Sequence, residues 1–172
     1  MEFDVNAIQD LSLIIFLVVL NGAFVATEFA MVRINPVHFT NQEGRRKVGS
    51  KTTMKLLERM ELALASVQLG ITVASILLGW FGVQIIYELL SQLLASATGM
   101  FTSEYISLVL MVISLAAIIF LHVVIGELSA KSIAVRYPEM VLRLLSAPVF
   151  LFVQGCRPII YVLNRSADLF LR

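Results

Sequence analysis

The chain has 172 residues and a formal net charge of +1; 59% of the residues are hydrophobic and 15% are charged, and the mean hydropathy is +0.89. This composition is too apolar for a soluble domain, and the apolar residues are spread too evenly for a soluble domain with a single anchor. We therefore interpret the chain as an all-α integral membrane domain. Its single cysteine, Cys156, excludes an intrachain disulfide and a thiolate metal cluster.

Three apolar runs predict a transmembrane domain over residues 1–137, with spans at about residues 8–33, 60–82 and 105–131. Acidic residues and no basic segment precede the first run, so we expect no cleaved signal peptide. The third run is the clearest, because residues 106–125 contain no Asp, Glu, Lys or Arg. Beyond the second span, the amphipathic stretch 83–97 is expected to lie on or near the outer surface.

The segment after the third span is harder to place. Tyr137 and Pro138 predict a helix end or a sharp turn. Residues 138–172 are apolar but interrupted by prolines and arginines, so we interpret them as a juxtamembrane belt of amphipathic helices along the cytoplasmic interface. A buried re-entrant pair is the lesser alternative. A fourth span would place Arg165 and Arg172 outside.

Positive charge is confined to two regions of the chain. Seven of the thirteen Lys and Arg residues lie in or beside the loop 34–59, the other six lie from Lys131 onwards, and residues 60–130 contain none. By the positive-inside rule both basic regions are cytoplasmic, which predicts three spans with the N-terminus outside and the C-terminus in the cytoplasm. The membrane is expected to be the cell inner (plasma) membrane. No nucleic-acid-binding module accompanies the basic loop, so we expect contact with the lipid bilayer and not with nucleic acid.

Glu127 is the most informative residue, because it ends the long uncharged run and follows Gly126 directly. A carboxylate at this depth is costly unless something pairs with it or binds to it. One interpretation is a functional site. The other is an ion pair with Lys131, four residues further along the helix, at the edge of the membrane.

Oxygen-bearing side chains on all three predicted helices fall in the cytoplasmic third of the membrane: Asn21, Thr27 and Glu28; Ser66 and Gln68; and Glu127. Two carboxylates with hydroxyl and amide oxygens form a hard-ligand set that suits Mg²⁺ or Ca²⁺. A helix that opens near Gly126 would add backbone carbonyl oxygens as ligands. His122 lies five residues before Glu127 and is expected to be a buried, hydrogen-bonded residue. A serine–histidine or histidine–histidine pair at usable spacing is missing, so we do not expect an enzyme.

Small residues recur every fourth position along the second span, as Ser66, Gly70 and Ala74, and again as Ser75 and Gly79. Residues of this size at this spacing let two membrane helices approach closely. The partner could be another span of the same chain or a second subunit.

Three stretches carry a family resemblance: FVATEFAMVRI, QLGITVASILLGWFG and LHVVIGELSAKSIA. In this order they resemble the transmembrane domain of the CorC/CNNM (cyclin M-like) magnesium transporters. The family motif Gly-Glu-Leu-x-Pro-Lys matches from Gly126 to Lys131, except that Ala130 replaces the proline. The resemblance implies that Glu127 belongs to a cation site, and it also matches the family's polar positions to Thr27, Glu28 and Gln68.

The resemblance further implies a homodimer with three spans per subunit, a cytoplasmic helical belt, and downstream CBS domains that bind ATP and are absent from this chain. Family members export Mg²⁺, some in exchange for Na⁺. We therefore expect a transporter that binds a largely dehydrated Mg²⁺ between the three helices near the cytoplasmic side. The alternative is a dimeric membrane scaffold or Mg²⁺ sensor that signals to cytoplasmic domains without transport.

Overall fold

The computed structural model describes residues 5–34, 51–98 and 104–170, and these residues contain helices and no strand. The all-helical prediction is therefore confirmed for the described part of the chain. Residues 35–50, which hold most of the predicted basic loop, lie outside it. The helices in chain order are α1 (Val5–Arg33), α3 (Lys51–Glu58), α4 (Met60–Thr98), α5 (Glu104–Leu121), the π-helix η2 (His122–Ser129), α6 (Ala130–Arg136) and α7 (Pro138–Phe170).

Four helical segments are long and apolar enough to cross a membrane: Ile8–Arg33, Met60–Ser96, Glu104–Arg136 and Pro138–Leu163. The chain is thus a multi-pass membrane protein. The first three segments contain the three predicted spans, and the fourth is the segment interpreted as an interfacial belt. A helix that crosses the membrane and one that lies along its surface can share the same length and composition, so the number of three spans stays a prediction.

The second predicted span continues further than the sequence indicated. Helix α4 runs through Gly82 without a break, and its 39 residues are about twice the roughly 20 that a bilayer core requires. Glycine is tolerated inside membrane helices. The stretch 83–97 is therefore the end of α4 and not a separate helix.

The chain divides into two compact units. The first unit combines residues 1–22 with residues 72–128, and the second combines residues 23–71 with residues 129–172. Each unit has its own packing.

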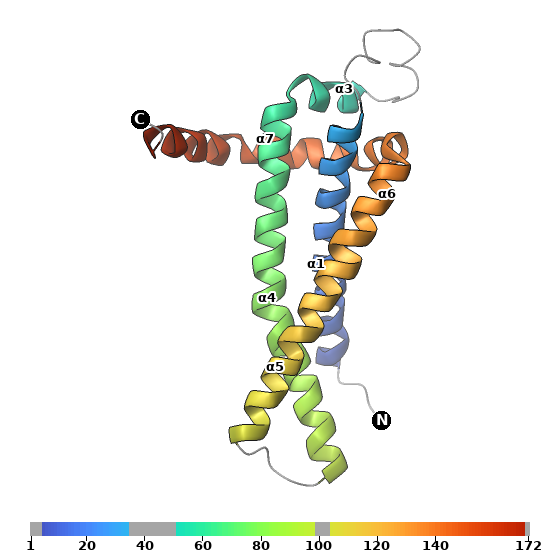
Figure 1. The fold of residues 1–172 in the computed structure, drawn as a ribbon, viewed down its shortest axis with the longest axis vertical. Coiled ribbons are helices and arrows are strands. Elements are labelled where there is room, and N and C mark those ends of the chain that lie inside the picture. The colour runs from blue at the N-terminus through green and yellow to red at the C-terminus, as the bar shows by residue number, and fades with distance from the viewer. Residues whose placement is uncertain (1–4, 35–50, 99–103, 171–172) are drawn as a thin grey trace. The chain divides into compact units, whose positions relative to one another are not determined.

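The core of the first unit joins α1, α4 and α5, which Figure 1 shows with α4 and α5 crossing. Gly82 lies at a close approach of α4 to α5, because a Cβ atom there would be 2.8 Å from Ile118 Cδ1. Apolar side chains at helical spacing fill this core: Ile14, Leu17 and Val18 on α1, Leu78 and Ile85 on α4, and Ile118 on α5.

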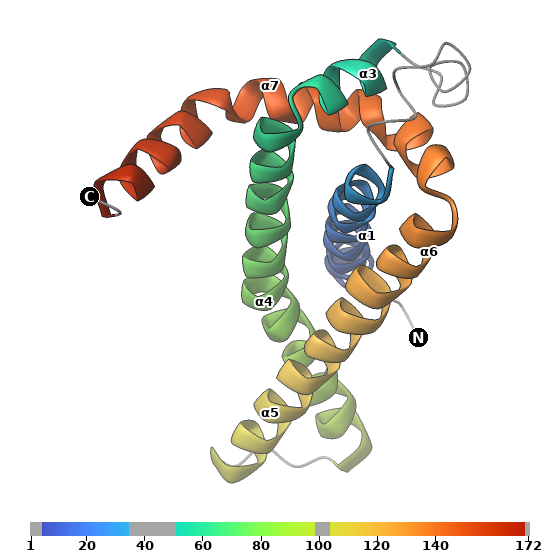
Figure 2. The same cartoon turned by 45° about the horizontal axis from the view of Figure 1, so that its top comes forward.

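In the second unit, α3 lies along α7 (Figure 2). Buried Thr53 donates a hydrogen bond to Ser146 Oγ at 3.0 Å, and Lys55 Nζ lies 5.8 Å from the centre of the Phe150 ring. The segments of α1 and α4 that belong to this unit run crosswise to α7 (Figure 1). Polar and aromatic contacts thus hold α3 and α7 together.

Helix α7 begins at Pro138, directly after α6 ends at Arg136, so the predicted break at this proline is confirmed. It then runs to Phe170 as one helix with Pro148 and Pro158 inside it. The alternative of a re-entrant pair is wrong, because α7 does not reverse direction (Figure 1). One face of α7 is buried at intervals of three and four residues: Leu142, Ser146, Val149, Val153, Cys156 and Ile160.

Candidate cation site at a π-helix

The long helical segment that begins with α5 is not α-helical over its whole length. At His122 it widens into the π-helix η2, which lasts to Ser129, and α6 resumes the α-helical pattern at Ala130. π-Helical turns are rare and occur frequently at functional sites. The sequence suggested that the helix could open near Gly126; the structure has a π-helix at this place, and it forms without a proline at position 130.

Gly126 permits α1 to approach the π-helix. It is buried, and a Cβ atom on it would lie 3.1 Å from Asn21 Nδ2 and 3.6 Å from the Val18 carbonyl oxygen. A side chain at this position would therefore press on the buried Asn21 amide, whereas its distance to the Val18 oxygen would be an ordinary van der Waals contact. The glycine serves a close helix contact as well as the wide turn.

A chain of polar contacts runs from this turn across three elements of the first unit. The Asn21 amide nitrogen donates to the Gly126 carbonyl oxygen at 3.3 Å, and Ser75 Oγ donates to Asn21 Oδ1 at 3.4 Å. Ser75 Oγ also lies 3.0 Å from His122 Nε2. The two bonds to Asn21 are longer than the common range for protein hydrogen bonds and are correspondingly weak. Asn21 is nevertheless fully buried, so they supply its polar partners.

Glu127 follows Gly126 in the same π-helix and is half-buried. Its carboxylate is a hard oxygen ligand beside backbone whose hydrogen bonding departs from the α-helical pattern. Of the seven predicted ligands, the first unit contains Glu127, Gly126 and Asn21, and it brings Asn21 and Gly126 into direct contact.

The second unit contains the other four predicted ligands. The hydroxyls of Thr27 and Ser66 are buried and donate to carbonyl oxygens one turn earlier in their own helices, at 2.7 and 2.8 Å. Gln68 is exposed. Glu28 is half-buried and interacts electrostatically with Lys131, whose Nζ lies 5.0 Å from the centre of the Phe29 ring.

Among the described residues, no three His, Cys, Asp or Glu side chains converge on one point. Within this part of the chain, carboxylates alone do not build a cation site. A cation at the π-helix would instead take a mixed set of carboxylate, amide and backbone oxygens.

Sequence reasoning did not find the part played by Ser75. It treated Ser75 as a small residue for helix contact, whereas the structure gives its hydroxyl two polar neighbours. The signal was available, because a hydroxyl among apolar residues inside a span requires a partner. The prediction that His122 is hydrogen-bonded is confirmed, although the residue is half-buried and not fully buried.

These features define a class: a multi-pass helical membrane domain with a polar π-helix inside an otherwise apolar helix. Residues 12–172 match the cyclin M transmembrane N-terminal domain, and the chain belongs to this family. The family is of the transporter type, is consistent with transport of Mg²⁺ or other divalent cations, and is not a known enzyme family.

Similar proteins come from several bacteria. YrkA of Bacillus subtilis, a UPF0053 protein, is 37% identical over 160 residues, which make up 91% of this chain and 36% of that protein. YhdP, a UPF0053 protein from the same organism, is 33% identical and is matched over 94% of this chain and 36% of its own length. MT1889 of Mycobacterium tuberculosis is 34% identical, over 93% and 45% respectively. The chain thus spans less than half the length of each of these relatives.

Proposed function

We propose that this domain transports Mg²⁺ across the membrane and that Glu127 is the principal ligand of the ion. The observation that carries the proposal is the π-helix at Gly126 and Glu127, inside a helix of 33 residues that is otherwise highly apolar. A carboxylate in such a helix is costly, and π-helical turns occur frequently at functional sites. Binding of a cation would offset the cost of the charge.

The ligands available at the π-helix match the chemistry of the ion. Mg²⁺ is a hard cation that takes oxygen ligands in octahedral geometry and gives up water reluctantly, so several oxygens must replace the lost waters together. Glu127 supplies charge, and the Gly126 carbonyl has a second lone pair besides the one that Asn21 engages. Thr27, Glu28, Ser66 and Gln68 remain predicted contributors.

The proposed direction and coupling rest on the family resemblance, which implies export of Mg²⁺ and, in some members, exchange for Na⁺. The basic flanks that we place in the cytoplasm include Lys131, four residues from Glu127, and a site near the cytoplasmic side would suit loading from inside. Na⁺ is also a hard cation and could use the same oxygens, which suits exchange. We further propose a homodimer, with ATP acting only through CBS domains downstream of this segment.

Flux into proteoliposomes tests the proposal. Wild-type protein is expected to carry Mg²⁺ down its gradient, as read by an entrapped Mg²⁺-sensitive dye. Glu127→Gln is expected to abolish the flux, because the amide keeps the size of the side chain but removes its charge. Glu104→Gln is the matched control, since Glu104 is exposed in the first turn of α5, and its flux should equal that of wild type.

One observation favours a second candidate, a membrane scaffold or Mg²⁺ sensor that carries no ion. The contacts of Asn21 with Gly126 and of Ser75 with His122 join helices, as the polar residues of a scaffold would. Wild-type protein without flux in this assay would contradict transport by this domain and favour the scaffold or sensor. Normal flux through Glu127→Gln would remove Glu127 from the mechanism.

A further inference from the structure

The hydrogen-bonded network at the π-helix includes two residues that the proposed cation site does not use, Ser75 and His122. Both lie in the first unit with Asn21 and Gly126. The geometry of this network decides which atom donates each hydrogen bond, and the direction of donation shows what the two residues do.

The argument starts at Gly126, because a backbone carbonyl oxygen can only accept. The Asn21 atom facing it must therefore be the amide nitrogen, which places Oδ1 toward Ser75. Oδ1 is also only an acceptor, so the Ser75 hydroxyl donates its single proton to it. Ser75 Oγ then has only lone pairs left for the other neighbour. His122 Nε2 must carry a hydrogen and donate it to Ser75.

We propose that His122 and Ser75 are positioning residues, which hold the Asn21 amide so that its N–H fixes the Gly126 carbonyl beside Glu127. The inference rests on the proposed function, because it assigns them to the site that would bind Mg²⁺. Neither residue touches the ion. They act through Asn21 on the shape of the π-helix.

The alternative histidine tautomer shows why the direction matters. With the hydrogen on Nδ1, His122 Nε2 would accept the Ser75 proton, and buried Asn21 Oδ1 would lose its donor. Nothing would then prevent the Asn21 amide from turning over, which would point Oδ1 at the Gly126 oxygen and separate the two. The carbonyl beside Glu127 would lose its fixed position.

The first test reads the tautomer directly and needs no variant at any of the four residues. The chain has two histidines, so His38→Gln leaves His122 alone for ¹⁵N-histidine NMR in lipid nanodiscs. The expected spectrum shows a hydrogen on Nε2. A spectrum in which Nε2 is unprotonated would overturn the inference.

The second test uses transport kinetics with conservative pairs of variants. Ser75→Ala is expected to raise the Mg²⁺ concentration for half-maximal flux about tenfold with little change in maximal flux, since outer partners of metal ligands commonly contribute 10- to 100-fold in affinity. Ser75→Thr keeps the hydroxyl and should restore wild-type kinetics. His122→Gln keeps a donor and should remain active, whereas His122→Leu should behave as Ser75→Ala.

Controls separate the inference from folding and from the proposed function. Ser96→Ala removes an exposed hydroxyl bonded within its own helix and should change nothing. Comparable thermal unfolding of all variants shows that folding is intact. Wild-type protein without Mg²⁺ flux overturns the proposed function and the transport role of these residues with it. Flux that is present but unaffected by Ser75→Ala overturns only this inference.

Discussion

At the residue scale, the contacts of Lys131 in the structure differ from those that its spacing from Glu127 suggested. The sequence offered Glu127 as its ion-pair partner. Within the second unit, the lysine reaches α1, where it interacts electrostatically with Glu28 and lies 5.0 Å from the Phe29 ring centre. Cations near the membrane are stabilised by both kinds of contact. Lys131 therefore links α6 to the C-terminal part of α1.

This link predicts a coupling that can be measured. Lys131→Met keeps the length of the side chain but removes its charge, and we expect it to lower stability by about 1 kcal/mol, as for partly exposed ion pairs. Glu28→Gln should cost a similar amount. The double variant should cost less than the sum, because each single change already removes the shared interaction.

Thermal unfolding in detergent gives the three free-energy differences. Lys131→Arg is the control, since it keeps the charge and the contact with the Phe29 ring. Strict additivity of the two single changes would contradict the link between Glu28 and Lys131.

At the element scale, α4 carries its small residues in two different settings. Gly70 faces α1, where a Cβ atom would lie 2.8 Å from the Phe24 ring, and that ring is itself buried with its centroid 4.8 Å from that of Phe152. At Gly79 a Cβ atom would meet no side chain and no other helix within 4 Å among the described residues. The small-residue pattern therefore marks a helix contact at Gly70 but none at Gly79 in this part of the chain.

The two glycines form a matched pair for mutation. Gly70→Ala is expected to lower the free energy of unfolding by about 1–3 kcal/mol, because the buried Phe24 ring cannot move aside without losing its own contacts. Gly79→Ala should be neutral or stabilise by up to about 1 kcal/mol through helix propensity. Equal effects at the two positions, in thermal unfolding of the purified domain, would show that Gly70 is not at a tight contact.

The contact of α3 with α7 gives a second prediction at this scale. Thr53 and Ser146 are both buried, and the hydroxyl of the first donates to that of the second. Thr53→Val keeps the shape but removes the donor, so we expect a loss of about 1 kcal/mol and faster hydrogen exchange in α3. Thr53→Ser should preserve both. Unchanged exchange in the valine variant would contradict a role of this bond in docking α3.

The elements themselves could largely be predicted from the sequence, because apolar runs, a proline after Tyr137 and a glycine before Glu127 act locally. The polar contacts could not. Asn21 and Gly126 lie 105 positions apart, and only the packing of α1 against η2 brings them together. The continuation of α4 through the stretch 83–97 was also missed, because its amphipathic pattern indicated a surface segment, whereas Gly82 lies inside the helix and permits close packing on Ile118.

At the scale of the whole molecule, the placement of α7 decides the topology. Its length would allow a fourth crossing, and its candidate span contains Arg143 and Arg157. Charged arginine side chains inside a membrane helix are costly, and here two lie within one candidate span. In the second unit α7 also runs crosswise to its segments of α1 and α4 (Figure 1). Both observations favour the interface over a crossing.

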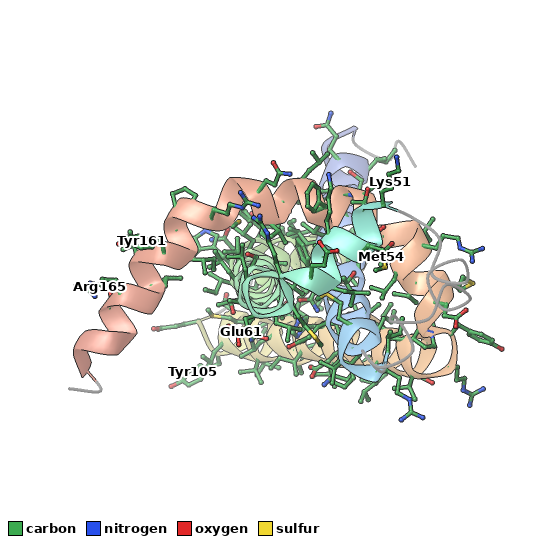
Figure 3. All side chains as sticks on the ribbon, turned by 90° about the horizontal axis from the view of Figure 1, so that it is seen from above. Lys51, Met54, Glu61, Tyr105, Tyr161 and Arg165 are labelled. Carbon is green, nitrogen blue, oxygen red and sulfur yellow. The ribbon has the colours of Figure 1, made fainter. Side chains whose placement is uncertain are left out.

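Counting crossings gives the decisive prediction, because an odd number puts the chain ends on opposite sides of the membrane and an even number puts them on the same side. Tyr105 is the second residue of α5 and is 84% exposed. Arg165 lies on the distal part of α7, far along that helix from Lys51 on α3 (Figure 3). In a Cys156→Ala background, single cysteines at these two sites can be labelled with a membrane-impermeant maleimide.

With three spans and the C-terminus inside, Tyr105→Cys reacts in intact cells, whereas Arg165→Cys reacts only after the cells are permeabilised. Lys51→Cys on α3 is the control for a cytoplasmic site, since it belongs to the basic flank that the positive-inside rule retains in the cytoplasm. Labelling of Arg165→Cys and Tyr105→Cys together in intact cells would mean that α7 crosses the membrane. Arg165 would then lie outside, and the basic belt would no longer be a feature of the cytoplasmic surface.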